Sequence, residues 1–115
     1  YRPPTSSSKI PIKEFLREID SELKKIRNYT TCVLIGDTNV DIKDDKDQNV
    51  KDYETILATW GFSRGIWDYT REEFRLGTLV RSCIDHIYIR TKFDNNKTAV
   101  VKTKISDHYV IVCDL

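Results

Sequence analysis

The sequence predicts an α/β or α+β protein whose sheet is mixed and largely antiparallel. Two observations support this prediction. In the first half, two segments with apolar side chains at helical spacing flank one buried strand. In the second half, short apolar stretches with strand character alternate with turn residues. A chain of 115 residues has room for one modest core, so we treat residues 1–115 as one domain.

The helices and the strand between them are predicted by local patterns. Residues 1–8 are rich in proline and serine, which favours an extended lead. From Pro11 to Arg27 the apolar side chains recur every three or four residues, which is typical of an amphipathic helix that begins near the proline. The continuous apolar run Thr31–Ile35 then suits a strand buried on both faces.

A second helix is predicted after a charged loop. The run Lys43–Asp47 is typical of a solvated loop. Asn49 can cap a helix over Val50–Trp60, and Gly61 can end it.

The remainder of the chain predicts short strands. We expect them around Gly65–Tyr69, Ser82–Arg90, Ala99–Ile105 and His108–Asp114, with a turn at Asp94–Asn96.

The composition narrows the possible partners. Hydrophobic residues make up 39% and charged residues 32% of the chain, which is typical of a globular segment. The formal net charge is only +1, so overall charge does not indicate nucleic-acid binding, although a local positive patch is compatible with it. No apolar run reaches membrane-spanning length, so we expect no membrane partner. Cys32, Cys83 and Cys113 are isolated in apolar stretches, which disfavours zinc and favours buried thiols in a reducing compartment.

Gly36-Asp37-Thr38-Asn39 is the first of three acidic motifs at the ends of apolar strands. Glycine lets the backbone turn sharply, so the side chains that follow can project from the end of the sheet. Asp37 could then orient a water molecule, and the Asn39 amide could donate to a phosphate oxygen. Taken alone, the motif is more typical of an ordinary turn.

The second motif is Ser82-Cys83-Ile84-Asp85-His86-Ile87. Strand alternation places Asp85 on the same face as apolar side chains, where an unpaired carboxylate is costly. A histidine is a suitable partner for it. His86 itself lies on the opposite face, so we expect a structural or surface role for it. The alternative is an edge strand whose Asp85 faces water.

The third motif is Ser106-Asp107-His108. Adjacent aspartate and histidine at a strand start can present a carboxylate to a divalent cation and an imidazole to a phosphate. A simple hairpin turn explains the tripeptide equally well. Acyl transfer by Ser106, His108 and Asp85 is set aside, because a serine two residues from its histidine is badly placed and no GxSxG motif is present.

Taken in order, the motifs resemble the endonuclease/exonuclease/phosphatase superfamily, and most closely the endonuclease domain of non-LTR retrotransposons, which accompanies a reverse transcriptase. The resemblance covers the whole chain and corresponds to the C-terminal half of that domain. It implies half of a four-layered α/β sandwich, with two helices on one face of the sheet. The motifs that carry it are Tyr1-Arg2-Pro3-Pro4, Gly36-Asp37-Thr38-Asn39, Thr70-Arg71, Ser82-Cys83-Ile84-Asp85-His86-Ile87 and Ser106-Asp107-His108-Tyr109.

The resemblance implies hydrolysis of DNA phosphodiester bonds with Mg²⁺ or Mn²⁺, and an intracellular, nuclear location. Asp37 would align the attacking water, Asn39 and His108 would contact the scissile phosphate, and Asp85 would orient the histidine ring. In addition, Tyr1 would lie beside the phosphate, Asp107 would take part in the metal site, and Thr70, Arg71 and Ser82 would contact DNA or support the site wall.

Members of this family are about twice as long, and their N-terminal half supplies an Asn and the Glu that is the principal metal ligand. Neither is found here, so we expect a catalytically incomplete fragment. We also expect the missing half, or a second copy in a homodimer, to cover an exposed apolar sheet. The alternatives are a phosphatase or abasic-site nuclease of the same fold, and a non-catalytic module that binds nucleic acid or protein.

Overall fold

The chain is an α+β protein in which all strand pairings among the described residues are antiparallel. The computed structural model describes residues 1 and 11–115, so the predicted extended lead lies almost entirely outside the described residues. The predicted fold class is confirmed. The elements are α1 (Ile12–Lys25), β1 (Cys32–Asp37), α2 (Gln48–Thr59), β2 (Ser63–Arg64), β3 (Arg71–Arg75), β4 (Thr78–Ser82), β5 (Asp85–Arg90), β6 (Lys97–Val101) and β7 (Val110–Asp114).

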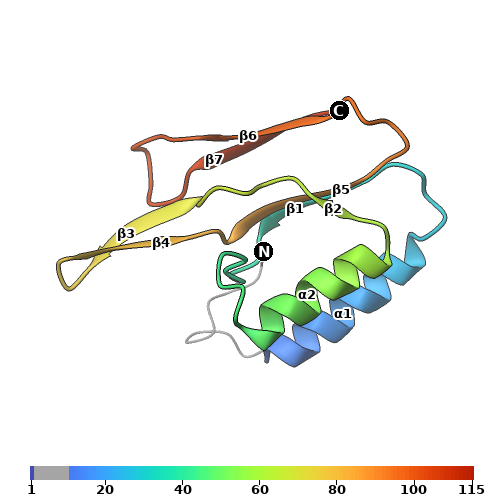
Figure 1. The fold of residues 1–115 in the computed structure, drawn as a ribbon, viewed down its shortest axis with the longest axis horizontal. Helices are drawn as coiled ribbons and strands as arrows, with labels where there is room; N and C mark the ends of the chain where they lie inside the picture. Colours follow the sequence, from blue (N-terminus) through green and yellow to red (C-terminus); the bar gives the residue numbers. More distant parts are fainter. Residues whose placement is uncertain (2–10) are drawn as a thin grey trace.

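The elements form three layers (Figure 1). The central sheet has the strand order β1-β5-β2, and the two helices lie side by side against one of its faces. The hairpin of β6 and β7 lies on the opposite side, and its inward side chains Val100, Ile111 and Cys113 pack against the core. The β3/β4 hairpin projects from one end of the molecule. Among the described residues, no helix has the length and apolar character needed to span a bilayer.

The two helices follow the predicted apolar patterns, with one correction at a helix start. In α1 the apolar face buries Leu16 and Leu23, as its spacing predicts. The cap of α2 is Asp47 rather than Asn49: the Asp47 carboxylate accepts a hydrogen bond from the Asn49 backbone N–H at 2.8 Å. A charged carboxylate at this position also interacts favourably with the positive end of the helix dipole.

The central strand β5 is the most deeply buried element. Residues Asp85 to Ile89 are all buried, because α1 and α2 cover one face and the β6/β7 hairpin covers the other. Its antiparallel register with β1 places Cys32 opposite Arg90 at one end and Asp37 opposite Asp85 at the other. Two carboxylates therefore meet at the same end of the sheet.

Several strand predictions are corrected by the structure. Residues 65–69 form no strand, and β2 is limited to Ser63–Arg64. The predicted strand over 82–90 is interrupted at residues 83–84. The strand predicted over 99–105 begins earlier and ends earlier, as β6, and the strand predicted over 108–114 begins two residues later, as β7. The β3/β4 hairpin was not predicted, because its side chains are largely charged and exposed and so lack a buried apolar face. Its turn uses Leu76 and Gly77, both with positive φ.

Gly65 joins the central sheet to the β6/β7 hairpin. Its N–H donates to the Ile87 carbonyl at 2.7 Å, and its own carbonyl accepts from the Thr98 hydroxyl. A Cβ at this position would lie 2.9 Å from Thr98 Cγ2 and 3.0 Å from the Ile87 oxygen. The backbone segment can approach this closely only because residue 65 has no side chain.

Gly65→Ala is therefore expected to lower the free energy of unfolding by roughly 1–3 kcal/mol, the usual effect of overpacking. Urea denaturation would measure the change. Thr98→Ser in the same chain keeps the hydroxyl and removes the clashing methyl, so it should restore part of the loss. An alanine variant as stable as the wild type would contradict the close packing between these layers.

Candidate active site

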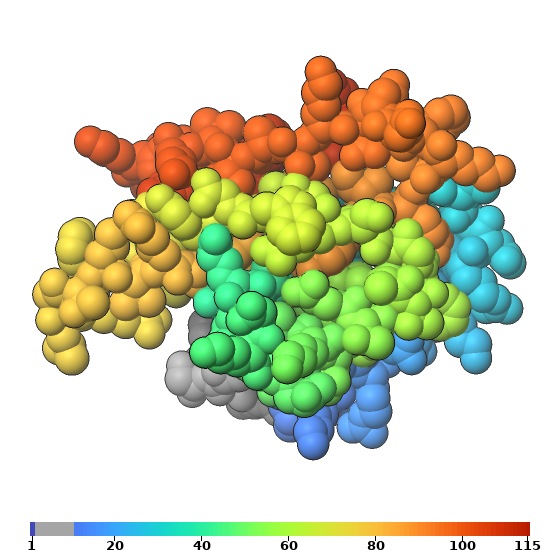
Figure 2. Space-filling view, in the orientation of Figure 1, coloured from blue at the N-terminus to red at the C-terminus, as the bar shows by residue number. Residues whose placement is uncertain are grey.

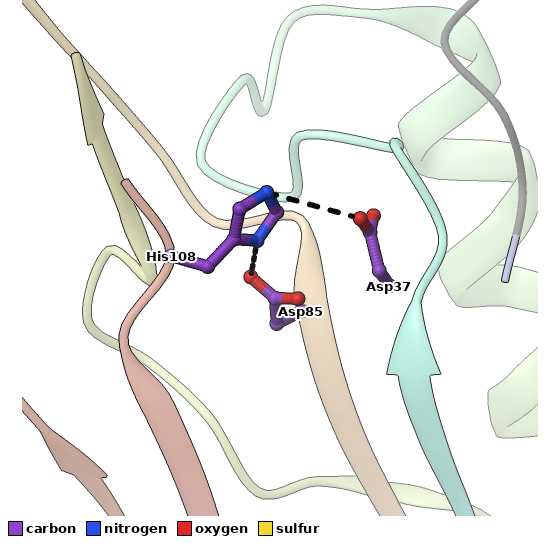
Figure 3. A group of neighbouring side chains, drawn as sticks. All are labelled: Asp37, Asp85 and His108. Atoms are coloured by element: carbon purple, nitrogen blue, oxygen red, sulfur yellow. Dashed lines mark hydrogen bonds and ion pairs between the residues drawn. The ribbon is translucent and has the colours of Figure 1, made fainter. Parts of the chain in front are cut away.

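Three titratable side chains from distant parts of the sequence meet at one end of the central sheet (Figure 3). Asp37 ends β1 and Asp85 begins β5, and the two are direct partners in the antiparallel register. Paired residues project to the same face of a sheet, so their carboxylates lie side by side. His108 comes from the segment between β6 and β7 and points between them.

The two ring nitrogens of His108 face different carboxylates. Nδ1 lies 2.9 Å from Asp85 Oδ2, a hydrogen-bonding distance, and Nε2 lies 4.0 Å from Asp37 Oδ2. The Asp85 carboxylate can only accept, so the hydrogen of this bond is on Nδ1. When the His108 ring is neutral, Nε2 therefore carries a lone pair. When the ring is an imidazolium, Nε2 carries a hydrogen as well as Nδ1.

The electrostatics of the two aspartates differ. Burial raises the pKa of Asp37, and the negative charge of Asp85 adds to that rise, while the Asn39 N–H and His108 oppose it. Asp85 is only 9% exposed, and His108 is the partner that the sequence predicted for it. The site thus holds two close carboxylates whose repulsion is relieved by one imidazole.

Thr70 fixes the start of β5. It is fully buried, and its hydroxyl accepts hydrogen bonds from the backbone N–H groups of Ile84 at 3.2 Å and Asp85 at 3.1 Å. Its carbonyl accepts from the Tyr109 N–H at 2.6 Å, beside His108. Thr70 therefore holds both members of the Asp85–His108 pair in place. This contact explains its position better than direct DNA contact, which its burial disfavours.

The turn after β1 presents Asp37 and Asn39. Asn39 has a φ of 52°, a left-handed conformation that asparagine tolerates well, and its N–H donates to Asp37 Oδ1 at 3.0 Å. The Thr38 N–H donates to the Ile84 carbonyl at 2.9 Å, which ties the turn to the segment before β5. The turn is therefore built to hold the Asp37 carboxylate, and it places Asn39 beside it.

His86 supports this turn from inside the protein. The His86 side chain is fully buried. Its Nδ1 lies 2.9 Å from the Tyr53 hydroxyl and 3.1 Å from the Thr38 hydroxyl. Its Nε2 lies 3.0 Å from the Cys83 carbonyl. A carbonyl can only accept, so Nε2 carries the hydrogen and Nδ1 accepts. Burial lowers the pKa of His86 to about 4, so it is neutral near pH 7. These contacts agree with the predicted structural role, although no sequence pattern pointed to its partners Tyr53 and Thr38.

The remaining predicted site residues lie around the three-residue cluster. Arg71 contacts Asp107 Oδ2 through Nε and a terminal nitrogen, both at 2.8 Å, and contacts Glu73 at 2.8 Å. The structure therefore places the Asp107 carboxylate against Arg71 and outside the cluster. The Ser82 carbonyl accepts from the Thr70 N–H, and the exposed Tyr1 lines a hollow of about 150 Å³ that also includes Asp37.

The donor set of the cluster fits a divalent cation. Asp37, Asp85 and His108 each offer one ligand atom, and these atoms lie within 4.8 Å of one another. Carboxylates completed by water suit Mg²⁺ or Mn²⁺, and an imidazole suits Mn²⁺ better than Mg²⁺. Because Asp85 Oδ2 is bonded to His108, its other oxygen and the Asp37 carboxylate are the best placed ligands.

No known protein-family profile matches this chain, and no curated protein sequence matches it.

Proposed function

We propose that this chain is the C-terminal half of a metal-dependent endonuclease domain of the endonuclease/exonuclease/phosphatase superfamily, of the kind found in non-LTR retrotransposons. Its reaction would be the hydrolysis of a DNA phosphodiester bond. The observation that carries the proposal is the His108 ring, bonded to Asp85 at Nδ1 and turned toward Asp37 at Nε2. The order of the motifs that supply these residues adds to it.

Each side chain has a role that its chemistry supports. His108, held by Asp85 at Nδ1, presents Nε2 to a phosphate oxygen and would stabilise the negative charge that develops in the transition state. Asp37 accepts a hydrogen bond from the attacking water and aligns it, and its raised pKa makes it a stronger base than an ordinary aspartate. The Asn39 amide can donate to the same phosphate.

Mg²⁺ or Mn²⁺, when bound, would polarise a phosphoryl oxygen. Asp37 and the second Asp85 oxygen would hold the ion, with water completing its coordination. Asp107 remains a proposed contributor to that site only if it leaves Arg71.

A partner surface belongs to the same proposal. Ile35 on β1 is 56% exposed, and Val101, Val110 and Val112 on the outer face of the β6/β7 hairpin are 43–46% exposed. Exposed apolar side chains on sheets favour cover by another protein surface. We propose that the N-terminal half of the domain, or a second copy of this chain, covers them. A monodisperse monomer in light scattering at micromolar concentration would contradict cover by a second copy of this chain.

Nicking of supercoiled plasmid by the purified chain tests the activity, with Mg²⁺, with Mn²⁺ and with EDTA. Because the N-terminal Asn and Glu are missing, we expect only weak metal-dependent nicking, which is lost in an Asp37→Ala/His108→Ala double variant. The double variant is the control for contaminating nucleases, and a Lys24→Gln variant, changed on the exposed face of α1, should nick like the wild type. A duplex with one abasic site, run in parallel, separates a general endonuclease from an abasic-site enzyme. Equal nicking by wild type and double variant would refute the proposed site, and no nicking at all would refute activity of this chain.

A further inference from the structure

Three cationic side chains converge on one aromatic ring outside the site described above. Lys102 Nζ lies 4.5 Å, Arg81 Cζ 4.8 Å and Lys43 Nζ 5.9 Å from the centroid of the Tyr69 ring. They come from the loop after β1, from β4 and from the segment after β6. The fold therefore gathers them from positions far apart in the sequence. We call Lys43, Tyr69, Arg81 and Lys102 the basic cluster.

The positive charge of the basic cluster is only loosely balanced. Glu72 lies 3.6 Å from Arg81 and Asp68 lies 3.7 Å from Lys102, both longer than a good charged hydrogen bond. Among residues 1 and 11–115, no ion pair forms at Lys43. The nearby Asp41 carboxylate accepts hydrogen bonds from the backbone N–H groups of Lys43 and Cys83.

The arrangement of the basic cluster favours an anion over a stacked base. Lys102 also donates to the Tyr69 hydroxyl at 3.1 Å, and this bond raises the pKa of Lys102, so the lysine stays charged. Cations occupy the surroundings of the Tyr69 ring, which leaves little room for a nucleobase to stack on it. Cations gathered around one ring add to the local positive potential, which attracts a phosphate.

The basic cluster is joined directly to the candidate active site. Tyr69 precedes Thr70, which binds the N–H of Asp85. Tyr109 follows His108, and its ring centroid lies 6.3 Å from that of Tyr69. The segments that carry the cluster also meet on one surface. Figure 2 shows as neighbours the loop after β1 (green), the stretch before β3 (yellow-green), β4 (amber) and the end of β6 (orange). The contacts of Thr70 and Tyr109 therefore connect the cluster to the active-site segments through the backbone.

We propose that Lys43, Arg81 and Lys102, arranged around Tyr69, bind the phosphodiester backbone of DNA adjacent to the phosphate at His108. This inference rests on the proposed function, since the bound strand is its substrate. The contacts are with phosphates, so the cluster sets affinity and register without reading sequence.

The test is the salt dependence of binding to a short fluorescein-labelled duplex of mixed sequence, measured by anisotropy in EDTA so that no cleavage occurs. Lys43→Gln/Lys102→Gln is compared with Lys24→Gln/Lys92→Gln, which removes the same charge at exposed positions outside the cluster. Lys43→Arg/Lys102→Arg keeps the charge. Thermal melts establish that all variants are folded.

For the glutamine variant of the cluster we expect a dissociation constant raised about tenfold near 0.1 M salt, and a slope of log K against log salt reduced by about one per lysine. The Lys24/Lys92 and arginine variants should bind like the wild type. Equal losses of affinity in both glutamine variants, or no loss of affinity in either, would overturn the proposal. A wild-type chain that does not bind the duplex would overturn it as well.

Plasmid nicking separates this proposal from the proposed function. If the wild type nicks plasmid and the Lys43→Gln/Lys102→Gln variant binds and nicks equally well, the nuclease stands and the cluster site fails. If the wild type does not nick but only that variant loses binding, the cluster site stands and the nuclease proposal for this chain fails.

Discussion

Asp85→Asn is expected to reduce the rate of plasmid nicking about 10³-fold, equivalent to about 4 kcal/mol of transition-state stabilisation. The carboxylate of Asp85 lies 2.9 Å from His108 Nδ1 and accepts the hydrogen of that nitrogen, which fixes the tautomer and the orientation of the ring. Asparagine has nearly the same shape, but its amide can also donate to Nδ1. The ring would then lose its single tautomer and orientation, and Nε2 would no longer be held toward the phosphate.

A conservative variant distinguishes this role from a merely structural one. If Asp85 acts by holding the His108 ring through its carboxylate, Asp85→Glu, which keeps a carboxylate, should retain more activity than Asp85→Asn. Asp94→Asn, in the exposed loop after β5, is the matched control and should nick at the wild-type rate. Equal losses in the glutamate and asparagine variants would contradict this role of the carboxylate.

The parts of the fold that sequence patterns predicted are those governed by local periodicity. The two helices and the strand β1 follow from apolar spacing, and all three lie close to where that spacing placed them. The prediction that β1 is buried on both faces is wrong, because β1 is an edge strand and Ile35 is 56% exposed. Asp37, Asp85 and His108 were singled out at the ends of apolar stretches, but their roles were assigned by the resemblance in motif order, since a turn or an exposed edge strand explained each motif alone. The three side chains meet because of the antiparallel register of β1 and β5, and no local sequence pattern shows that register.

The features that sequence patterns missed depend on contacts between distant residues. The β3/β4 hairpin has charges on both faces, so no alternation marks it. Thr70 was assigned to DNA contact or to support of the site wall, and its hydrogen bonds to the backbone N–H groups of Ile84 and Asp85 are of the second kind, although no pattern pointed to these partners. The cations around Tyr69 were invisible for the same reason, since Lys43, Arg81 and Lys102 lie in three separate segments.

The stability of the chain is expected to fall by roughly 3 kcal/mol as the pH drops from about 6.5 to about 4, because of His86. Burial lowers its pKa from 6.5 to about 4, so over this range the unfolded chain takes up a proton that the folded chain does not. The stabilisation is therefore fully present above pH 6.5 and is lost below it. The raised pKa of Asp37 acts in the opposite sense and offsets part of the loss at the acidic end.

Urea denaturation between about pH 7 and pH 4.5 would measure this loss, and the two histidines of the chain provide matched variants. His86→Gln should be less stable near pH 7, because the bonds to Tyr53, Thr38 and Cys83 are disturbed, but its stability should change much less with pH. His108→Gln is the comparison for the histidine in the active-site cluster. If His108→Gln abolishes the dependence instead, the titrating group is in the active-site cluster. With His86 as the titrating group, acid loosens the turn that holds Asp37, because Thr38 in that turn contacts the same ring.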